Sequence, residues 1–74
     1  MWLNLETYAE ERDHWTPSYR ASIDARWPLD GDEQRVRLAD GSEVTATVDR
    51  CDHRYSWLDA DGQELDVVAV ELAP

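Results

Sequence analysis

Two Asp-Gly turns constrain this chain more than any other feature of its sequence. The first, Asp40-Gly41, separates an alternating polar and apolar stretch at 35–39 from a second one at 43–49. An Asp-Gly dipeptide between alternating stretches is the strongest short-range indication of a β-hairpin, because both residues tolerate the positive φ angles of a tight turn. The pattern therefore predicts two antiparallel strands joined at residues 40–41.

The second Asp-Gly turn predicts a further pair of strands. It follows the alternating stretch Tyr55-Ser56-Trp57 and closes the run Asp59-Ala60-Asp61-Gly62. Residues 65–72 beyond it are almost continuously apolar, which is typical of a strand that is covered on both faces.

The N-terminal residues predict one more strand and one short helix. Residues 2–8 place Leu3 and Leu5 on the same face of an extended chain, which indicates a first strand. Residues 9–14 contain helix formers and no turn glycine, and they predict a short helix or helical turn.

The segment between residues 15 and 27 permits two interpretations. Apolar side chains occupy every odd position, and this strict period of two favours a strand at about 18–27. The rival is a helix that Thr16 caps and in which Pro17 stands in the first turn, with residues 19, 23 and 27 on one face. We prefer the strand, because the alternation is unbroken.

These elements predict a single domain, residues 1–74, of the mainly β class. We expect a small antiparallel meander of 4–6 strands, curled as a sheet or closed into an SH3-like open barrel, with one short helix near 9–14. A chain of 74 residues leaves little room for a deep pocket beside its core, so we expect a protein that offers a surface and is not an enzyme.

The charge is strongly negative and narrows the choice of partner. Seventeen Asp and Glu residues stand against seven Arg and no Lys, a net charge of −10. Direct binding of nucleic acid or of an anionic membrane needs a basic patch, so both are disfavoured, and a basic partner is expected. A hydrophobic content of 42% is enough for a folded core.

The acidic residues concentrate in the predicted turns. In a simple meander the turns alternate between the two ends of the sheet, so the acids form two groups. We expect them to form the partner-binding surface. The candidates at one end are Asp40, Glu43, Asp59, Asp61 and Glu64, and those at the other end are Asp30, Asp32 and Glu33, beside Asp49 and Asp52.

Three other groups of residues were considered for chemistry, and each has a simpler explanation. Cys51 and His53 supply only two of the four ligands of a structural zinc site, and the nearby acids disfavour a thiolate. The run from Asp59 lacks the glycine and the bidentate glutamate of a calcium loop. Residues 10–14 are acidic, with one histidine, but nothing beside them predicts a pocket. We therefore predict no catalytic residue, no metal site and no cofactor.

The four tryptophans are expected to lie mostly in the core. Each one buries a large apolar area, and a small β domain has few other residues that fill its interior as well. One of the four would be exposed as an anchor for a partner, and Trp2 and Trp15 are the best candidates because they stand outside the clearest hairpins.

In size, acidity and lack of catalytic residues the chain resembles phage-encoded acidic DNA mimics, including small anti-CRISPR proteins. This resemblance covers the chain only as a type, and no motif transfers residue roles. It implies a binding inhibitor that occupies a basic DNA- or RNA-binding site of a bacterial effector complex, as a monomer or a homodimer. The alternative is a small interaction or structural domain whose charge serves solubility or adaptation to high salt. An enzyme that uses Cys51 and His53 ranks third.

The compartment is expected to be the cytoplasm, which is the host cytoplasm for a phage-encoded chain. The N-terminus has no basic start followed by a long apolar run, and the single cysteine forms no internal disulfide.

Overall fold

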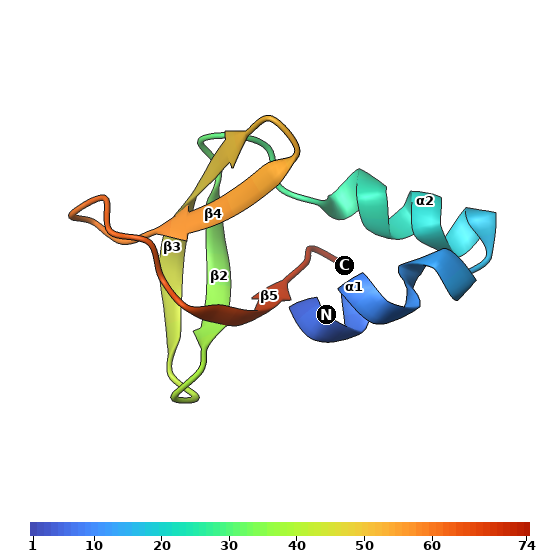
Figure 1. Ribbon diagram of the computed structural model, residues 1–74, viewed down its shortest axis with the longest axis horizontal. Coiled ribbons are helices and arrows are strands. Elements are labelled where there is room, and N and C mark those ends of the chain that lie inside the picture. Colours follow the sequence, from blue (N-terminus) through green and yellow to red (C-terminus); the bar gives the residue numbers. More distant parts are fainter.

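A computed structural model describes residues 1–74 as a five-stranded antiparallel sheet with two short α-helices beside it (Figure 1). The predicted mainly β fold with 4–6 strands is thereby confirmed. No helix is long and apolar enough to cross a membrane. The elements, in chain order, are β1 (Trp2–Asn4), α1 (Leu5–Glu11), the 3-10 helix η1 (Arg12–His14), α2 (Pro17–Arg26), β2 (Glu33–Leu38), β3 (Glu43–Cys51), β4 (Arg54–Leu58) and β5 (Val67–Glu71).

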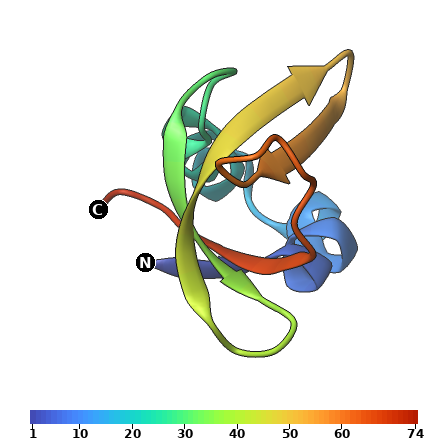
Figure 2. The same cartoon turned by 90° about the vertical axis from the view of Figure 1, so that its left-hand side faces the viewer.

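The strand order is β1-β5-β2-β3-β4. The chain meanders through β2, β3 and β4, and the first predicted hairpin pairs Val36 with Val44. The last strand does not continue beside β4, because β5 crosses back and pairs with β2, where Val70 faces Val36. Figure 2 shows β2 and β3 bending together as one long hairpin, with β5 crossing beside β2.

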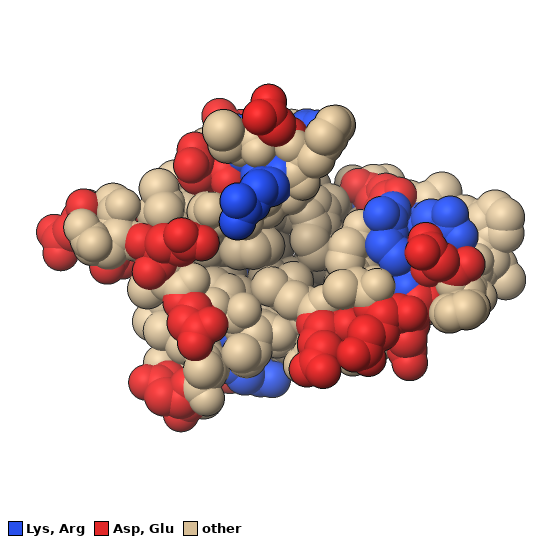
Figure 3. All heavy atoms as spheres, in the orientation of Figure 1, with Lys and Arg blue, Asp and Glu red and all other residues tan.

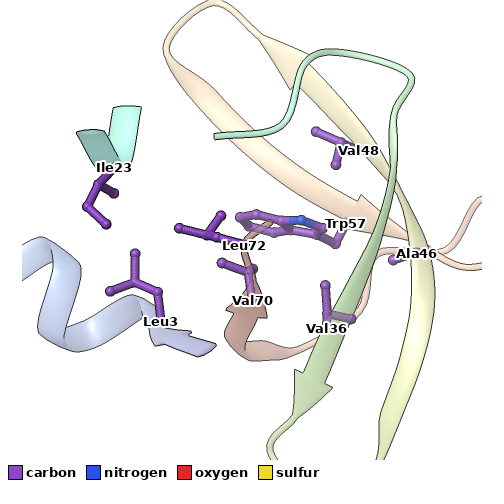
Figure 4. Packing of buried hydrophobic residues seen from close by; sticks show 8 residues of the cluster. All are labelled: Leu3, Ile23, Val36, Ala46, Val48, Trp57, Val70 and Leu72. Atoms are coloured by element: carbon purple, nitrogen blue, oxygen red, sulfur yellow. The ribbon is translucent and has the colours of Figure 1, made fainter. Parts of the chain in front are cut away.

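The core lies between the concave face of the sheet and the helices. Figure 4 shows Ile23 of α2 and Leu3 of β1 directed toward Leu72, on the side of the sheet where Trp57 also lies. Alternation along the strands puts one set of side chains on this face and the polar set on the other. The buried cluster consists of Leu3, Ile23, Val36, Ala46, Val48, Trp57, Val70 and Leu72.

The strand predicted at 18–27 is wrong, because this segment is the helix α2. The Thr16 hydroxyl accepts a hydrogen bond from the Tyr19 backbone N–H at 3.3 Å, and Pro17 occupies the first turn. Both features are typical of a helix start. Only Ile23 is buried, so the alternating apolar residues do not face a common neighbour as they would in a strand.

The first strand is shorter than predicted, and the helix after it begins earlier. The side-chain oxygen of Asn4 accepts hydrogen bonds from the backbone N–H groups of Glu6 at 2.9 Å and Thr7 at 3.1 Å. This N-cap ends β1 and starts α1 at Leu5. The helix expected near 9–14 is therefore present, but as the end of α1 followed by η1.

Candidate functional site

The candidate acids lie in three loops around the sheet. Asp30, Asp32 and Glu33 precede or begin β2, and Asp40 and Glu43 flank the β2–β3 turn. The β4–β5 loop carries the remaining candidates, Asp59, Asp61 and Glu64. Figure 3 shows acidic side chains at the left-hand end, over the β4–β5 loop, and at the foot of the β2–β3 hairpin.

Backbone hydrogen bonds show which of these loops lie together. The Ala39 N–H donates to the Asp66 carbonyl at 3.2 Å, so the β4–β5 loop ends beside the β2–β3 turn. At the other end, the Val48 N–H donates to the Asp32 carbonyl at 2.8 Å, which holds residues 28–32 against the second half of β3. The loop before β2 therefore lies at one end of the hairpin, and Asp66, at the end of the β4–β5 loop, lies at the other. The tip of the β4–β5 loop projects from the sheet apart from the β2–β3 turn (Figure 1), so the candidate acids form three groups in place of the two predicted ones.

Two candidate aspartates shape the turns in which they stand. One Asp40 oxygen accepts from the Ser42 backbone N–H and hydroxyl, and Gly41 follows with φ of 91°. One Asp59 oxygen accepts from the backbone N–H groups of Asp61 and Gln63, both at 2.9 Å. Such side-chain-to-backbone bonds stabilise turns. They leave the negative charge in place, so both carboxylates remain available to attract a cationic partner.

The aspartates before β2 also have internal roles. One Asp30 oxygen accepts from the Arg50 backbone N–H at 2.8 Å and ties the loop to the end of β3. One Asp32 oxygen accepts from the Leu29 backbone N–H at 2.8 Å inside the loop. These bonds fix the positions of two charges at this end of the sheet.

Glu43 is the one candidate whose charge is balanced inside the protein. Its carboxylate lies 3.2 Å from a nitrogen of Arg37 and 3.9 Å from a nitrogen of Arg35, on the outer face of the hairpin. The register that pairs Arg37 with Glu43 places them side by side. Glu43 is therefore a weak candidate for partner binding, while no ion pair involves Glu33, Asp61 or Glu64.

Most of the acidic charge has no basic counterpart. Apart from the Glu43 pairs, the only ion pair joins Arg12 to Asp24 at 3.8 Å. The other carboxylates form no ion pair and repel one another, since the net charge is −10. This arrangement gives the protein a negative potential that extends over about 8–10 Å at physiological ionic strength.

The hydrogen bonds at the β2–β3 turn make the ionisation of Asp40 a probe of this loop. The Ser42 hydroxyl, and next the Ser42 backbone N–H, favour the charged carboxylate and lower the pKa of Asp40 below its ordinary value. Because the folded-state pKa is the lower one, the associated stability is present above the unfolded pKa and is lost as pH falls through the folded pKa.

We expect Ser42→Ala to raise the pKa of Asp40 toward its ordinary value, since the variant removes the stronger of the two donors. An NMR titration of the Asp40 carboxyl carbon measures this pKa directly. Ser56→Ala, on the distant strand β4, is the matched control and should leave the pKa unchanged. An unchanged pKa in Ser42→Ala would show that the turn is not built as described.

The other groups considered for chemistry form no assembled site. Cys51 is exposed at the end of β3, and Asp52 follows in a tight turn with φ of 57°. No three His, Cys, Asp or Glu side chains lie close enough together to hold a metal ion, and the surface has no pocket.

The expectation of one exposed tryptophan is wrong. Trp57 is buried, and Trp2, Trp15 and Trp27 are each partly buried. The exposed aromatic side chain is instead Tyr19, with 43% of its surface accessible. Tyr19 lies on the same face of α2 as Ile23, but one turn nearer the start of the helix, at the end that lies away from the sheet in Figure 1. The interpretation of this segment as a strand did not predict this position.

Tyr8 of α1, whose ring packs against Trp15 and Trp27, has a perturbed pKa. Burial raises the pKa of Tyr8 above its ordinary value. The nearby Arg12 charge opposes this increase, and the Asp24 carboxylate adds to it. A tyrosine is protonated at neutral pH without this shift, so the raised pKa reports the partial burial of the Tyr8 ring.

The chain matches no protein-family model, no curated protein and no solved structure.

Proposed function

We propose that this protein is a non-enzymatic inhibitor that binds through its acidic loops to a basic nucleic-acid-binding site of a bacterial effector complex. The observation that supports the proposal best is the β4–β5 loop and the strand after it, residues 59–74, which contain five acids and no basic residue. Two of these acids, Asp61 and Glu64, form no hydrogen bond or ion pair through their carboxylates within the protein.

The loop positions suit a protein that imitates a nucleic acid. Hydrogen bonds through Asp30, Asp32, Asp40 and Asp59 hold the loops in defined shapes. Neighbouring strands lie about 4.8 Å apart, so loops at one end of a sheet, each of which joins two strands, recur about every 10 Å. A duplex carries one phosphate per strand about every 3.4 Å, and Lys and Arg side chains recognise both patterns of negative charge.

Inhibition of this kind needs no turnover. Long-range attraction between the acidic loops and a basic site would speed association, and a desolvated subset of ion pairs would set the rate of dissociation. While bound, the protein would exclude the nucleic acid by occupying its site.

The test is capture of partners from a bacterial lysate on the immobilised protein. We expect nucleic-acid-binding proteins to be retained at low salt, to elute at intermediate salt and to be displaced by a short DNA duplex, because all three effects follow from competition for one basic site. Mass spectrometry identifies the retained proteins.

Two charge-reversed variants make this test specific. Asp61→Lys with Glu64→Lys should remove most of the retention, and it leaves the Asp59 turn intact. Glu10→Lys with Glu11→Lys makes the same change of charge on α1, at the far end of the molecule. This variant should keep most of the retention of the captured proteins.

The proposal fails if duplex DNA does not displace the captured proteins, or if both variants lose retention equally. If nothing is retained and the free energy of unfolding rises with salt, the acidity is an adaptation to salt. That outcome would favour the alternative of a small interaction domain.

A further inference from the structure

A continuous row of aromatic rings joins the helices to the sheet. The ring centroids of Tyr19 and Trp15 lie 4.9 Å apart, and those of Trp15 and Tyr8 lie 5.8 Å apart. The row continues through Trp27, which stacks on Tyr8 at 4.7 Å, to Tyr55 of β4 at 6.1 Å. We call these five side chains the aromatic row: Tyr19, Trp15, Tyr8, Trp27 and Tyr55.

The chain's own arginines show how such rings are used in this protein. The guanidinium of Arg12 lies over the Tyr8 ring, 5.1 Å from its centroid, and that of Arg50 lies 5.7 Å from the centroid of Tyr55. Both are cation–π contacts, in which the negative face of the ring attracts the cation. Two rings of the row therefore already carry a guanidinium, whereas Trp15 and Tyr19 have none over them.

The end of the aromatic row that carries no guanidinium is also the end that is exposed to solvent. Tyr19 has 43% of its surface exposed, and Trp15 beside it is partly exposed. The Tyr19 backbone is held by the Thr16 cap, and its ring packs edge-on against Trp15. A side chain placed in this way loses little conformational freedom when a partner covers it, which is the usual property of tyrosines that anchor interfaces.

The helical part of the chain is net negative, but an arginine lies at this end of the row. Residues 5–27 contain five acids and three arginines, and the Arg20 guanidinium donates to the backbone carbonyls of Asp13 at 3.4 Å and of Trp15 at 3.5 Å. Figure 3 shows an acidic patch over α1, with arginines and acids side by side near it. A cation that reaches the Tyr19 ring is therefore attracted by the ring face and by the overall charge of −10.

We propose that the exposed Tyr19–Trp15 end of the aromatic row binds an arginine side chain from a basic peptide segment of a partner protein. Arginine is favoured over lysine, because its planar, weakly hydrated guanidinium stacks on aromatic rings and an ammonium ion does so less well. This contact lies on the helices, apart from the acidic loops. It therefore gives the protein a selectivity for arginine over lysine, which charge attraction alone does not give.

The probes are two synthetic peptides of equal length and charge, nona-arginine and nona-lysine. Isothermal titration calorimetry at moderate salt measures both affinities for the wild-type protein and for its variants. We expect nona-arginine to bind about two- to fivefold more tightly, the effect of one exposed cation–π contact. Tyr19→Ala should remove this preference while leaving nona-lysine binding unchanged. Tyr19→Phe keeps a ring and should keep the preference.

Two controls separate this contact from other effects. Leu29→Ala removes a more exposed apolar side chain, 67% accessible, from the loop before β2, and should leave the preference intact. Asp61→Lys with Glu64→Lys should weaken both peptides alike, because it acts through charge.

The proposal is overturned if the two peptides bind equally to the wild-type protein, or if Tyr19→Ala retains the arginine preference. Circular dichroism establishes that Tyr19→Ala keeps its helices. If that variant unfolds, the chemical shifts of the Trp15 and Tyr19 rings in the wild-type protein decide the question. Larger shifts with nona-arginine than with nona-lysine support the contact, and equal shifts refute it. If the lysate test shows no captured nucleic-acid-binding protein but the preference for nona-arginine persists, the inhibitor function is refuted and the arginine contact is not.

Discussion

Replacing Ile23 with alanine should lower the free energy of unfolding by about 2–5 kcal/mol, the range measured for buried large-to-small substitutions. The Ile23 side chain is fully buried and is the only buried residue of α2. It packs with Leu3 and Leu72 between the helix and the sheet. The substitution leaves a cavity at the one point where the helix enters the core.

The cost is large for a domain of this size. Small domains bury a modest fraction of their surface, and a stability near 5 kcal/mol is at the low end for folded proteins. We therefore expect Ile23→Ala to be partly unfolded at room temperature. Urea denaturation followed by tryptophan fluorescence measures the change, because the row that contains Trp15 and Trp27 separates when α2 leaves the sheet.

Ser18→Ala is the matched control on the same helix. Ser18 is exposed in the first turn of α2, so this variant should change stability by no more than about 0.5 kcal/mol. A similar small effect for Ile23→Ala would mean that α2 does not pack on the sheet as described.

The second large effect is expected at the buried pair formed by Gln34 and Trp57. The Trp57 indole N–H donates to the Gln34 side-chain oxygen at 2.7 Å, and both side chains are buried. The Gln34 amide nitrogen in turn donates to the Glu71 carbonyl at 3.3 Å, which links β4 to β5 through β2. Gln34→Leu keeps the bulk but leaves the indole N–H unsatisfied. It should cost about 1–3 kcal/mol.

A double-mutant cycle separates this hydrogen bond from packing. Trp57→Phe removes the indole donor, so Gln34→Leu should cost less in that background than in the wild-type protein. Urea denaturation of the four proteins gives the coupling free energy. Equal costs in the two backgrounds would show that the bond contributes nothing to stability.

The hairpins could be predicted from the sequence because their determinants are local. Asp40-Gly41 and the alternation on either side of it act within a few residues, and the resulting register also places Glu43 opposite Arg37. The hairpin register that the sequence predicts was therefore a signal that Arg37 would neutralise the charge of Glu43. The loop position of the other acids followed from the same turns, but which oxygens bond to backbone N–H groups depends on loop shape.

Residues 15–27 show where the local sequence pattern predicts the wrong secondary structure. A period of two from residue 15 to 27 predicts a strand only if one face of that strand has a sheet or core to cover it. The Thr16 cap and Pro17 instead start a helix that needs to bury only Ile23. Tyr19 consequently lies on the surface, and the aromatic row could not be foreseen.

The sequence by itself therefore determined the turns, the excess of negative charge and the mainly β class, because each depends on residues close together in the chain or on composition alone. Only the tertiary structure decided that β5 pairs with β2, that α2 is a helix, and that five rings from α1, α2, β4 and the segments that flank α2 meet in one row. These outcomes depend on which apolar surfaces cover one another across the whole chain, and burial is a property of the assembled core.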